Sequence, residues 1–174
     1  MKTLYLLRHA KSAWADPGLA DHDRPLAPRG RQAAASMADY IGKRPGGPPP
    51  LDLVLCSTAR RARETLAAVL PAWAPRPPVL EEDGLYLCGA DALLRRLRSL
   101  ADGIDAVLLI AHNPDLQELT LSLARGGAEG LMAQARAKYP TGALARLELD
   151  VADWGRLRPG DGRLMEFVLP RNLP

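Results

Sequence analysis

Phenylalanine occurs only once in this chain of 174 residues, and cysteine occurs only twice. The apolar core must therefore be built mainly from Leu, Ala and Val. The two cysteines, Cys56 and Cys88, lie outside any metal-ligand spacing and are too few for a disulfide framework. We therefore expect two free thiols, as is usual in a reducing compartment.

Long apolar runs and long basic runs are also missing. Only residues 4–7 form an apolar run before Arg8, which is too short for a signal sequence or a membrane span. The basic residues are spread along the chain at a formal net charge of +3, whereas a nucleic-acid-binding protein usually concentrates them. These absences predict a cytoplasmic protein with neither a nucleic acid nor a membrane as partner. The mild positive charge suits an anionic substrate.

The overall numbers are those of one soluble globular domain that comprises residues 1–174. Hydrophobic residues make up 47% of the chain and charged residues 25%, which are ordinary proportions for such a domain. The length is sufficient for a substantial core.

Short apolar runs and helical patterns alternate along the chain, and they predict strands and helices in turn. The segment 45–50, rich in Pro and Gly, should end the first helix. Ser57 and Asp91 are expected to cap the second and third helices. This alternation predicts a three-layer α/β/α sandwich around a mainly parallel sheet. The expected strands are 3–7, 51–56, 79–80, 104–111, 143–149 and 164–169, and the expected helices are 28–43, 57–70, 91–100, one from 114 or 115, and 129–137.

Polar side chains follow three of the predicted strands, at the point where each strand ends. Arg8 and His9 follow the first strand, the arginine-rich segment 57–65 follows the second, and His112 follows the strongest one. Ligands of open α/β sheets bind at the carboxyl ends of the strands, where helix N-termini also point. Guanidinium groups bind phosphate oxygens in pairs and stay charged at any working pH. Together the three strand ends predict a phosphoryl-transfer site.

Each of these features alone also has an ordinary explanation. An Arg-His pair at a strand end or a histidine after a strand is often a surface or loop residue. Arginines in the first turn of a helix are unfavourable beside the helix dipole unless an anion offsets them, and this favours phosphate binding. The third histidine, His22, lies between two aspartates and is either an exposed loop residue or a residue that faces the substrate.

The segment Leu6-Leu7-Arg8-His9-Ala10-Lys11-Ser12 resembles the signature of the histidine phosphatase superfamily, also called phosphoglycerate mutase-like. Further segments that match this family follow in the family's order, and the resemblance covers nearly the whole chain. The branch that they resemble is that of the SixA-type phosphohistidine phosphatases. The resemblance implies the phosphoglycerate mutase-like fold. The further segments that match the family are 23–26 with Arg29-Gly30, 56–65, 111–114, 139–143, and, near the end of the sequence, 159–160 and 169–171.

The resemblance also implies roles for individual residues. The nucleophile of the family corresponds to His9, and its second histidine corresponds to His112. Its two phosphate-binding arginines correspond to Arg8 and Arg61. Further substrate contacts are expected from Ser12, from Arg60 at the rim and from Asn113.

This chain departs from the family pattern at two positions, and the second departure argues against a mutase. Ala10 stands where the family signature usually has glycine, as in much of the SixA-like branch. Ala15 follows Trp14, where mutases often have an asparagine that contacts the phosphate.

The expected reaction is attack of neutral His9 on phosphorus, followed by hydrolysis of the phosphohistidine enzyme. Arg8, Arg61 and His112 are expected to hold the charge on the phosphoryl oxygens. The arginines supply the positive charge, so neither a metal nor another cofactor is expected. A general acid could be Glu82 or Asp83, or these two residues could form a solvated acidic turn.

Three functions stay open at this stage. The first is a phosphatase that acts on a phosphorylated protein carrying phosphohistidine, because imidazole leaves more easily than an alkoxide. The second is a phosphatase of a small phosphorylated metabolite, such as a sugar phosphate or a nucleotide, which would need the general acid. The third is an inactive module that binds phosphate or a phosphoprotein.

Overall fold

The computed structural model describes residues 1–173, whose strands form one seven-stranded sheet. The strand order is β3-β2-β4-β1-β6-β7-β5. Only β6 runs antiparallel to its neighbours, and the other pairs are parallel. The prediction of a mainly parallel sheet is confirmed. The strands are β1 (Lys2–Arg8), β2 (Leu53–Ser57), β3 (Val79–Glu82), β4 (Ala106–Ala111), β5 (Ala124–Gly127), β6 (Leu144–Leu149) and β7 (Gly162–Val168).

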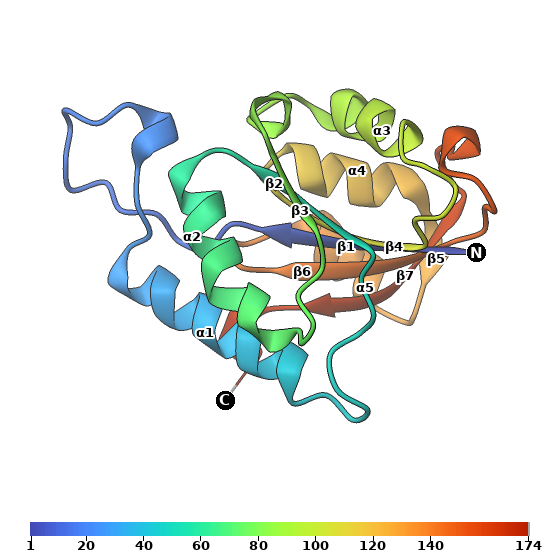
Figure 1. Ribbon diagram of the computed structural model, residues 1–174, viewed down its shortest axis with the longest axis horizontal. Helices are drawn as coiled ribbons and strands as arrows, with labels where there is room; N and C mark the ends of the chain where they lie inside the picture. Colours follow the sequence, from blue (N-terminus) through green and yellow to red (C-terminus); the bar gives the residue numbers. More distant parts are fainter. Residues whose placement is uncertain (174) are drawn as a thin grey trace.

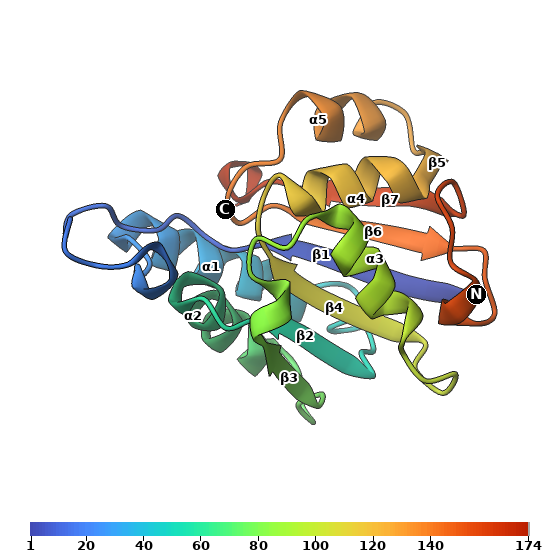
Figure 2. The ribbon, with the colours of Figure 1, turned by 90° about the horizontal axis from the view of Figure 1, so that it is seen from above.

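Helices cover both faces of the sheet, as the predicted three-layer sandwich requires. Figures 1 and 2 show α1 and α2 against one face and α3 and α4 against the other. The short α5 packs beside α4 and β7. Among the described residues no helix is long and apolar enough to span a membrane. The helices are α1 (Pro28–Gly42), α2 (Arg60–Val69), α3 (Ala90–Arg98), α4 (Asp115–Leu123) and α5 (Leu131–Ala137).

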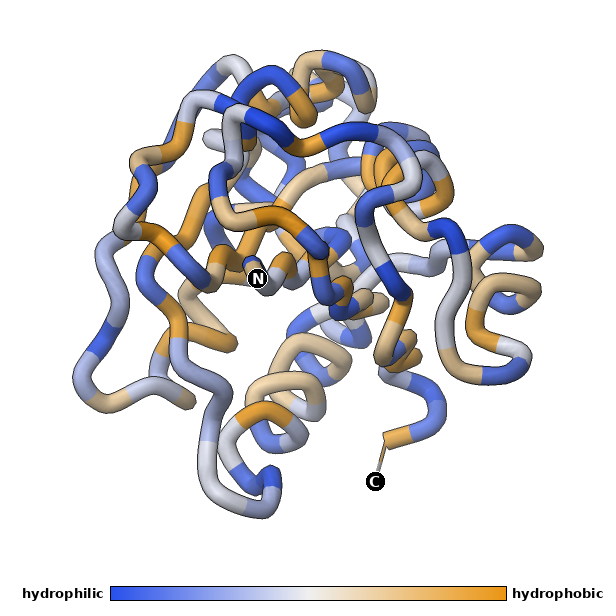
Figure 3. Tube along the Cα trace, turned by 90° about the vertical axis from the view of Figure 1, so that its right-hand side faces the viewer, coloured by the Kyte–Doolittle hydropathy of each residue, from blue (hydrophilic) through white to orange (hydrophobic). Residues whose placement is uncertain are grey.

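The core consists of two apolar layers, one on each face of the sheet. Along β1 successive side chains point to opposite faces. Leu4 and Leu6 therefore pack with α3 and α4, while Tyr5 and Leu7 pack with α1 and α2. In Figure 3 the hydropathy colours alternate along the helices, as expected for helices with one apolar face.

The strand register brings the three polar strand ends together. Arg8 at the end of β1 pairs with Ala111 at the end of β4, and Cys56 in β2 pairs with Ile110. The residues that follow these strands therefore lie at one edge of the sheet. Residues 10–27 leave this edge as a long loop before α1, which is visible in Figures 1 and 2.

Two glycines allow the segment after β1 to pack closely. The N–H of Gly142, whose φ is +77°, donates to the carbonyl oxygens of Arg8 and His9 at 3.1 and 3.0 Å. A Cβ at Gly30 in α1 would lie 2.0 Å from the carbonyl oxygen of Lys11, a separation that no real side chain tolerates. These contacts fix the backbone on both sides of His9.

The two predicted helix caps are wrong, and strand β5 was not predicted. Helix α2 begins at Arg60 after Ala59, without a side-chain cap. The hydroxyl of Ser57 lies 2.8 Å from His112 Nε2 instead. Helix α3 begins after Gly89, whose φ of +85° turns the chain, so Asp91 lies inside the first turn.

Candidate active site

Two histidines form the centre of the site. The ring centroids of His9 and His112 are 5.2 Å apart, and both side chains are buried. His9 Nδ1 lies 2.7 Å from the carbonyl oxygen of Ala10, which can only accept, so Nδ1 carries the proton. The lone pair of His9 is therefore on Nε2, which faces the arginine of α2.

Arg61 joins the two histidines. It is the second residue of α2, and its Nε donates to His9 Nε2 at 3.3 Å. Its Nη2 lies 3.4 Å from His112 Nδ1. If Arg61 donates to that nitrogen, His112 carries its proton on Nε2 and donates it to Ser57. A guanidinium between two neutral imidazoles is a site for an anion.

Thr65 connects α2 to the loop that follows His9. Its hydroxyl donates to the carbonyl oxygen of Arg61, one turn earlier, at 2.7 Å, and accepts from the N–H of Ala10 at 3.0 Å. The spacing of Arg61 and Thr65 in the sequence thus fixes the N-terminus of α2 against the loop that follows His9.

Arg8 lies on the other side of the site. Its Nη1 donates to the carbonyl oxygen of Tyr139 at 2.7 Å. Its buried Nε has no hydrogen-bond partner among residues 1–173. A buried donor without an acceptor is costly, so a ligand oxygen that accepted from it would be favoured.

Asp21 is a site residue that the sequence reasoning missed. Its carboxylate accepts from Arg61 Nη2 at 2.9 Å, from Arg24 Nη1 at 2.8 Å and from the hydroxyl of Tyr86 at 2.5 Å. These hydrogen bonds, that of Tyr86 first, hold the pKa of the carboxyl far below its usual range. The only sign of this role in the sequence was the acidic segment 21–23. The contact between Asp21 and Arg61 depends on how that segment folds back over α2.

The three predicted substrate contacts lie outside this central cluster. Ser12 accepts a hydrogen bond from Arg24 at 2.6 Å. Arg60 is exposed and forms an ion pair with Glu64, so the structure does not bring it to the two histidines. Asn113 donates to the carbonyl oxygen of Tyr139 at 3.3 Å. Their roles toward a substrate stay predictions.

The two candidate acids differ in their partners. Glu82 forms an ion pair with Arg96, at 2.7 Å from Nη2 to the carboxylate. Asp83 accepts from the hydroxyl of Thr58, which lies 3.0 Å from His22 Nε2. The carboxylate of Glu82 is therefore already bound by Arg96, and that of Asp83 reaches only the rim of the site.

The rim is formed by aromatic and imidazole rings. The Tyr86 ring lies edge-on to both His22 and His112, at centroid distances of 4.9 and 5.3 Å. His22 is thus part of the rim instead of an isolated loop residue. Among the described residues no group of three His, Cys, Asp or Glu side chains is placed to hold a metal ion.

Burial keeps both central histidines neutral. Loss of hydration lowers the pKa of His9 to about 3 and that of His112 to about 4, and the neighbouring arginines add to the effect. A neutral imidazole with an unprotonated Nε2 is the form that a nucleophile needs.

These pKa values predict a loss of stability in mild acid. In the unfolded chain both histidines titrate near 6.5, so above that pH neither state binds the extra protons. As the pH falls from about 6.5 to about 4, the unfolded state binds protons that the folded state excludes. The free energy of unfolding should then fall by about 1 to 3 kcal/mol per pH unit.

Urea titrations between about pH 7 and pH 5 measure this slope. The control is the H9N/H112N variant, which keeps every carboxylate and lacks both imidazoles. Its unfolding free energy should change less over the same interval. An equal slope in the two proteins would show that the two histidines are not responsible.

Comparisons with known proteins agree with this geometry. The family model of the histidine phosphatase superfamily (branch 1) matches residues 4–86. A candidate phosphohistidine phosphatase SixA from Nakamurella multipartitia is 30% identical and has a TM-score of 0.80, with 97% of this chain and 96% of that chain covered. This chain belongs to the histidine phosphatase superfamily.

Two further relatives extend over the same length. A candidate phosphohistidine phosphatase SixA from Agrobacterium tumefaciens is also 30% identical, with a TM-score of 0.80 over 97% of this chain and 98% of that one. An uncharacterized protein of Mycobacterium tuberculosis is 35% identical over 167 residues, which cover 95% of this chain and all of the relative. The expected phosphoglycerate mutase-like fold is confirmed, and the chain is a phosphatase of this superfamily.

Proposed function

We propose that this histidine phosphatase removes the phosphoryl group from phosphohistidine on a phosphorylated protein, without a metal or other cofactor. In the first step His9 Nε2 attacks phosphorus in line. The bond between phosphorus and the substrate imidazole breaks, and its electron pair stays on that imidazole, which takes a proton from water. In the second step water attacks the phosphohistidine enzyme, which releases inorganic phosphate and restores neutral His9.

The pocket residues have a common task in both steps. Arg8 and Arg61 bind the phosphoryl oxygens, whose charge is the main obstacle to the reaction. His112 lies beside the same oxygens, and an anion bound there raises its pKa from the lowered value of about 4. The unpaired Nε of Arg8 is a donor for one of these oxygens.

The ionised state of Asp21 supports a phosphohistidine substrate. An alkoxide leaving group needs a proton from a nearby acid, worth about 10²–10⁴-fold in rate. The carboxylate that contacts Arg61 is held ionised by three donors, so Asp21 cannot supply that proton. Glu82 is held by Arg96. An imidazole leaving group needs no such acid. The SixA relatives support the same substrate class.

A comparison of leaving groups tests this proposal. We expect the purified protein to hydrolyse a phosphohistidine peptide and p-nitrophenyl phosphate, whose leaving groups depart readily. The value of kcat/KM for an alkyl phosphate such as a sugar phosphate should be lower by about 10² or more. Efficient cleavage of the sugar phosphate with no release of phosphate from the peptide would overturn the proposal and favour a small-molecule phosphatase.

A further inference from the structure

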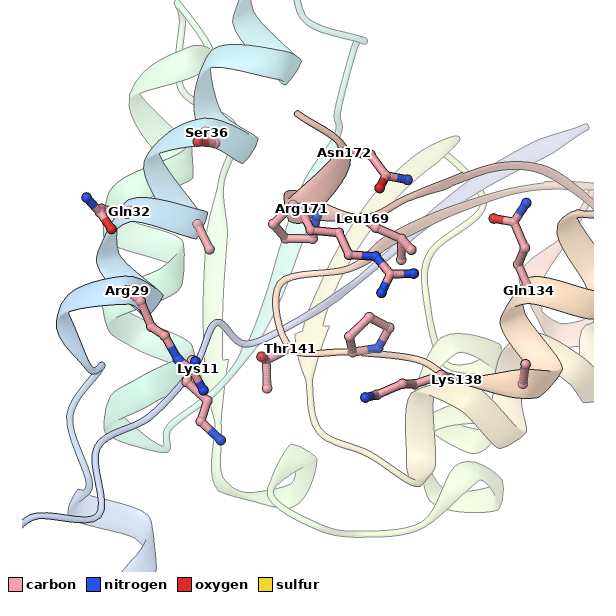
Figure 4. A pocket seen from close by; sticks show the side chains of 14 residues that line it. Lys11, Arg29, Gln32, Ser36, Gln134, Lys138, Thr141, Leu169, Arg171 and Asn172 are labelled. Carbon is pink, nitrogen blue, oxygen red and sulfur yellow. The ribbon is translucent and has the colours of Figure 1, made fainter. Parts of the chain in front are cut away.

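A large groove lies beside the phosphate pocket at the same edge of the sheet. Strand β6 begins and β7 ends at this edge, next to the end of β1 that carries the nucleophile. The groove encloses about 740 Å³. Figure 4 shows that it lies between α1, the segment that precedes β6 and the last residues of the chain.

The lining of this groove is positively charged. Four cationic side chains reach it from separate segments, namely Lys11, Arg29, Lys138 and Arg171. No Asp or Glu is among its lining residues within the described part of the chain, and none of the four cations forms an ion pair there. Figure 4 shows Lys138 and Arg171 on one side of Thr141 and Lys11 and Arg29 on the other.

Two residues that line the groove are close in sequence to the segments that hold His9. Lys11 follows the nucleophile by two residues, and its side chain lines the groove. Thr141 also lines the groove, and the next residue, Gly142, donates its N–H to the carbonyl oxygen of His9 at 3.0 Å. The segments that line the groove are thus direct sequence neighbours of those that hold His9, at the same edge of the sheet.

We propose that this groove binds an acidic segment that flanks the phosphorylated histidine of the protein substrate. This inference rests on the proposed function. A phosphoryl group alone needs only the pocket around Arg8 and Arg61. Four cations on separate segments, without an ion-pair partner among residues 1–173, match an extended ligand with several carboxylates. The groove thus selects the partner, while the pocket performs the reaction.

Two matched peptides test the selection. Each carries one phosphohistidine, which is flanked by glutamates in one peptide and by glutamines in the other. We expect kcat/KM for the glutamate peptide to be about tenfold higher, because several exposed ion pairs add to its binding. Raising the ionic strength should reduce this preference, because salt screens exposed charges.

A double variant, K138Q/R171Q, tests whether the groove is responsible. Both side chains line the groove and neither contacts the two central histidines. The variant should lose the preference for the glutamate peptide and hydrolyse p-nitrophenyl phosphate at the normal rate. The control is R76Q/R163Q, which removes the same charge from exposed positions near the start of β3 and β7, at the opposite edge of the sheet. It should keep the preference.

The possible failures are distinguishable. If both peptides are hydrolysed equally well, the groove proposal is overturned and the proposed function stands. If the control variant loses the preference as fully as K138Q/R171Q does, the selection arises from net charge and the groove is not the binding surface. If neither peptide is hydrolysed while sugar phosphates are, the proposed function itself fails. The peptide comparison needs no variant, so it holds even if a variant does not fold.

Discussion

Replacement of His9 by alanine should lower kcat by about four to six orders of magnitude, because the attacking atom itself is removed. His9 Nε2 is unprotonated and faces Arg61, whereas the two ring nitrogens of His112 contact Arg61 and Ser57. Rapid-quench experiments with a ³²P-labelled substrate measure both turnover and the label on the protein. The variant should carry no acid-labile, base-stable phosphoryl group.

The matched control is H22A, which removes the third histidine. His22 lies at the rim, against Thr58 and Tyr86, and has no contact with the other two imidazoles. H22A should still become labelled and keep its rate within about tenfold. An inactive binding module would behave differently, since the native protein would show no turnover and H9A would bind phosphate unchanged. Labelling of H9A would contradict the assignment of the nucleophile.

Replacement of Arg61 by lysine should lower kcat/KM by about 10³, although the charge is kept. The guanidinium reaches His9, His112 and Asp21 at the same time. An ammonium group cannot present donors in this planar arrangement. Steady-state kinetics with p-nitrophenyl phosphate measure the effect, and circular dichroism shows whether the variant is folded.

The neighbouring arginine provides the control for this prediction. Arg60 precedes Arg61 in α2, but its side chain is exposed and paired with Glu64. R60K should keep kcat/KM within about twofold, since an exposed ion pair contributes little. A large loss in R60K would restore the predicted role of Arg60 in substrate binding.

The grouping of Arg8, His9 and His112 at one edge of the sheet could be predicted because each position follows from local sequence. Arg8, His9 and His112 stand where apolar strands end, and parallel strands of one sheet deliver such ends to one edge. Arg61 was distinguished from its neighbours by the family pattern. The structure gives the physical reason, because Arg61 is on the buried side of α2 whereas Arg60 is exposed.

Features that depend on tertiary contacts could not be predicted. Ser57 has the side chain of a helix cap, but its hydroxyl is used by His112, which is distant in sequence. Strand β5 has the sequence Ala-Arg-Gly-Gly, which carries no strand pattern, and its backbone approaches Leu164 so closely that Gly127 leaves no room for a Cβ. Asp21 reaches the site only because residues 10–27 fold back over α2.

The carboxylate of Asp21 also bears on how the product leaves. Arg61 already has an anionic partner, so an arriving phosphoryl group finds a cation that is partly neutralised. Inorganic phosphate then competes with a carboxylate tethered to the same chain, and an intramolecular competitor cannot be diluted. Asp21 should therefore weaken the binding of every phosphate species at Arg61, and the released inorganic phosphate should leave more readily.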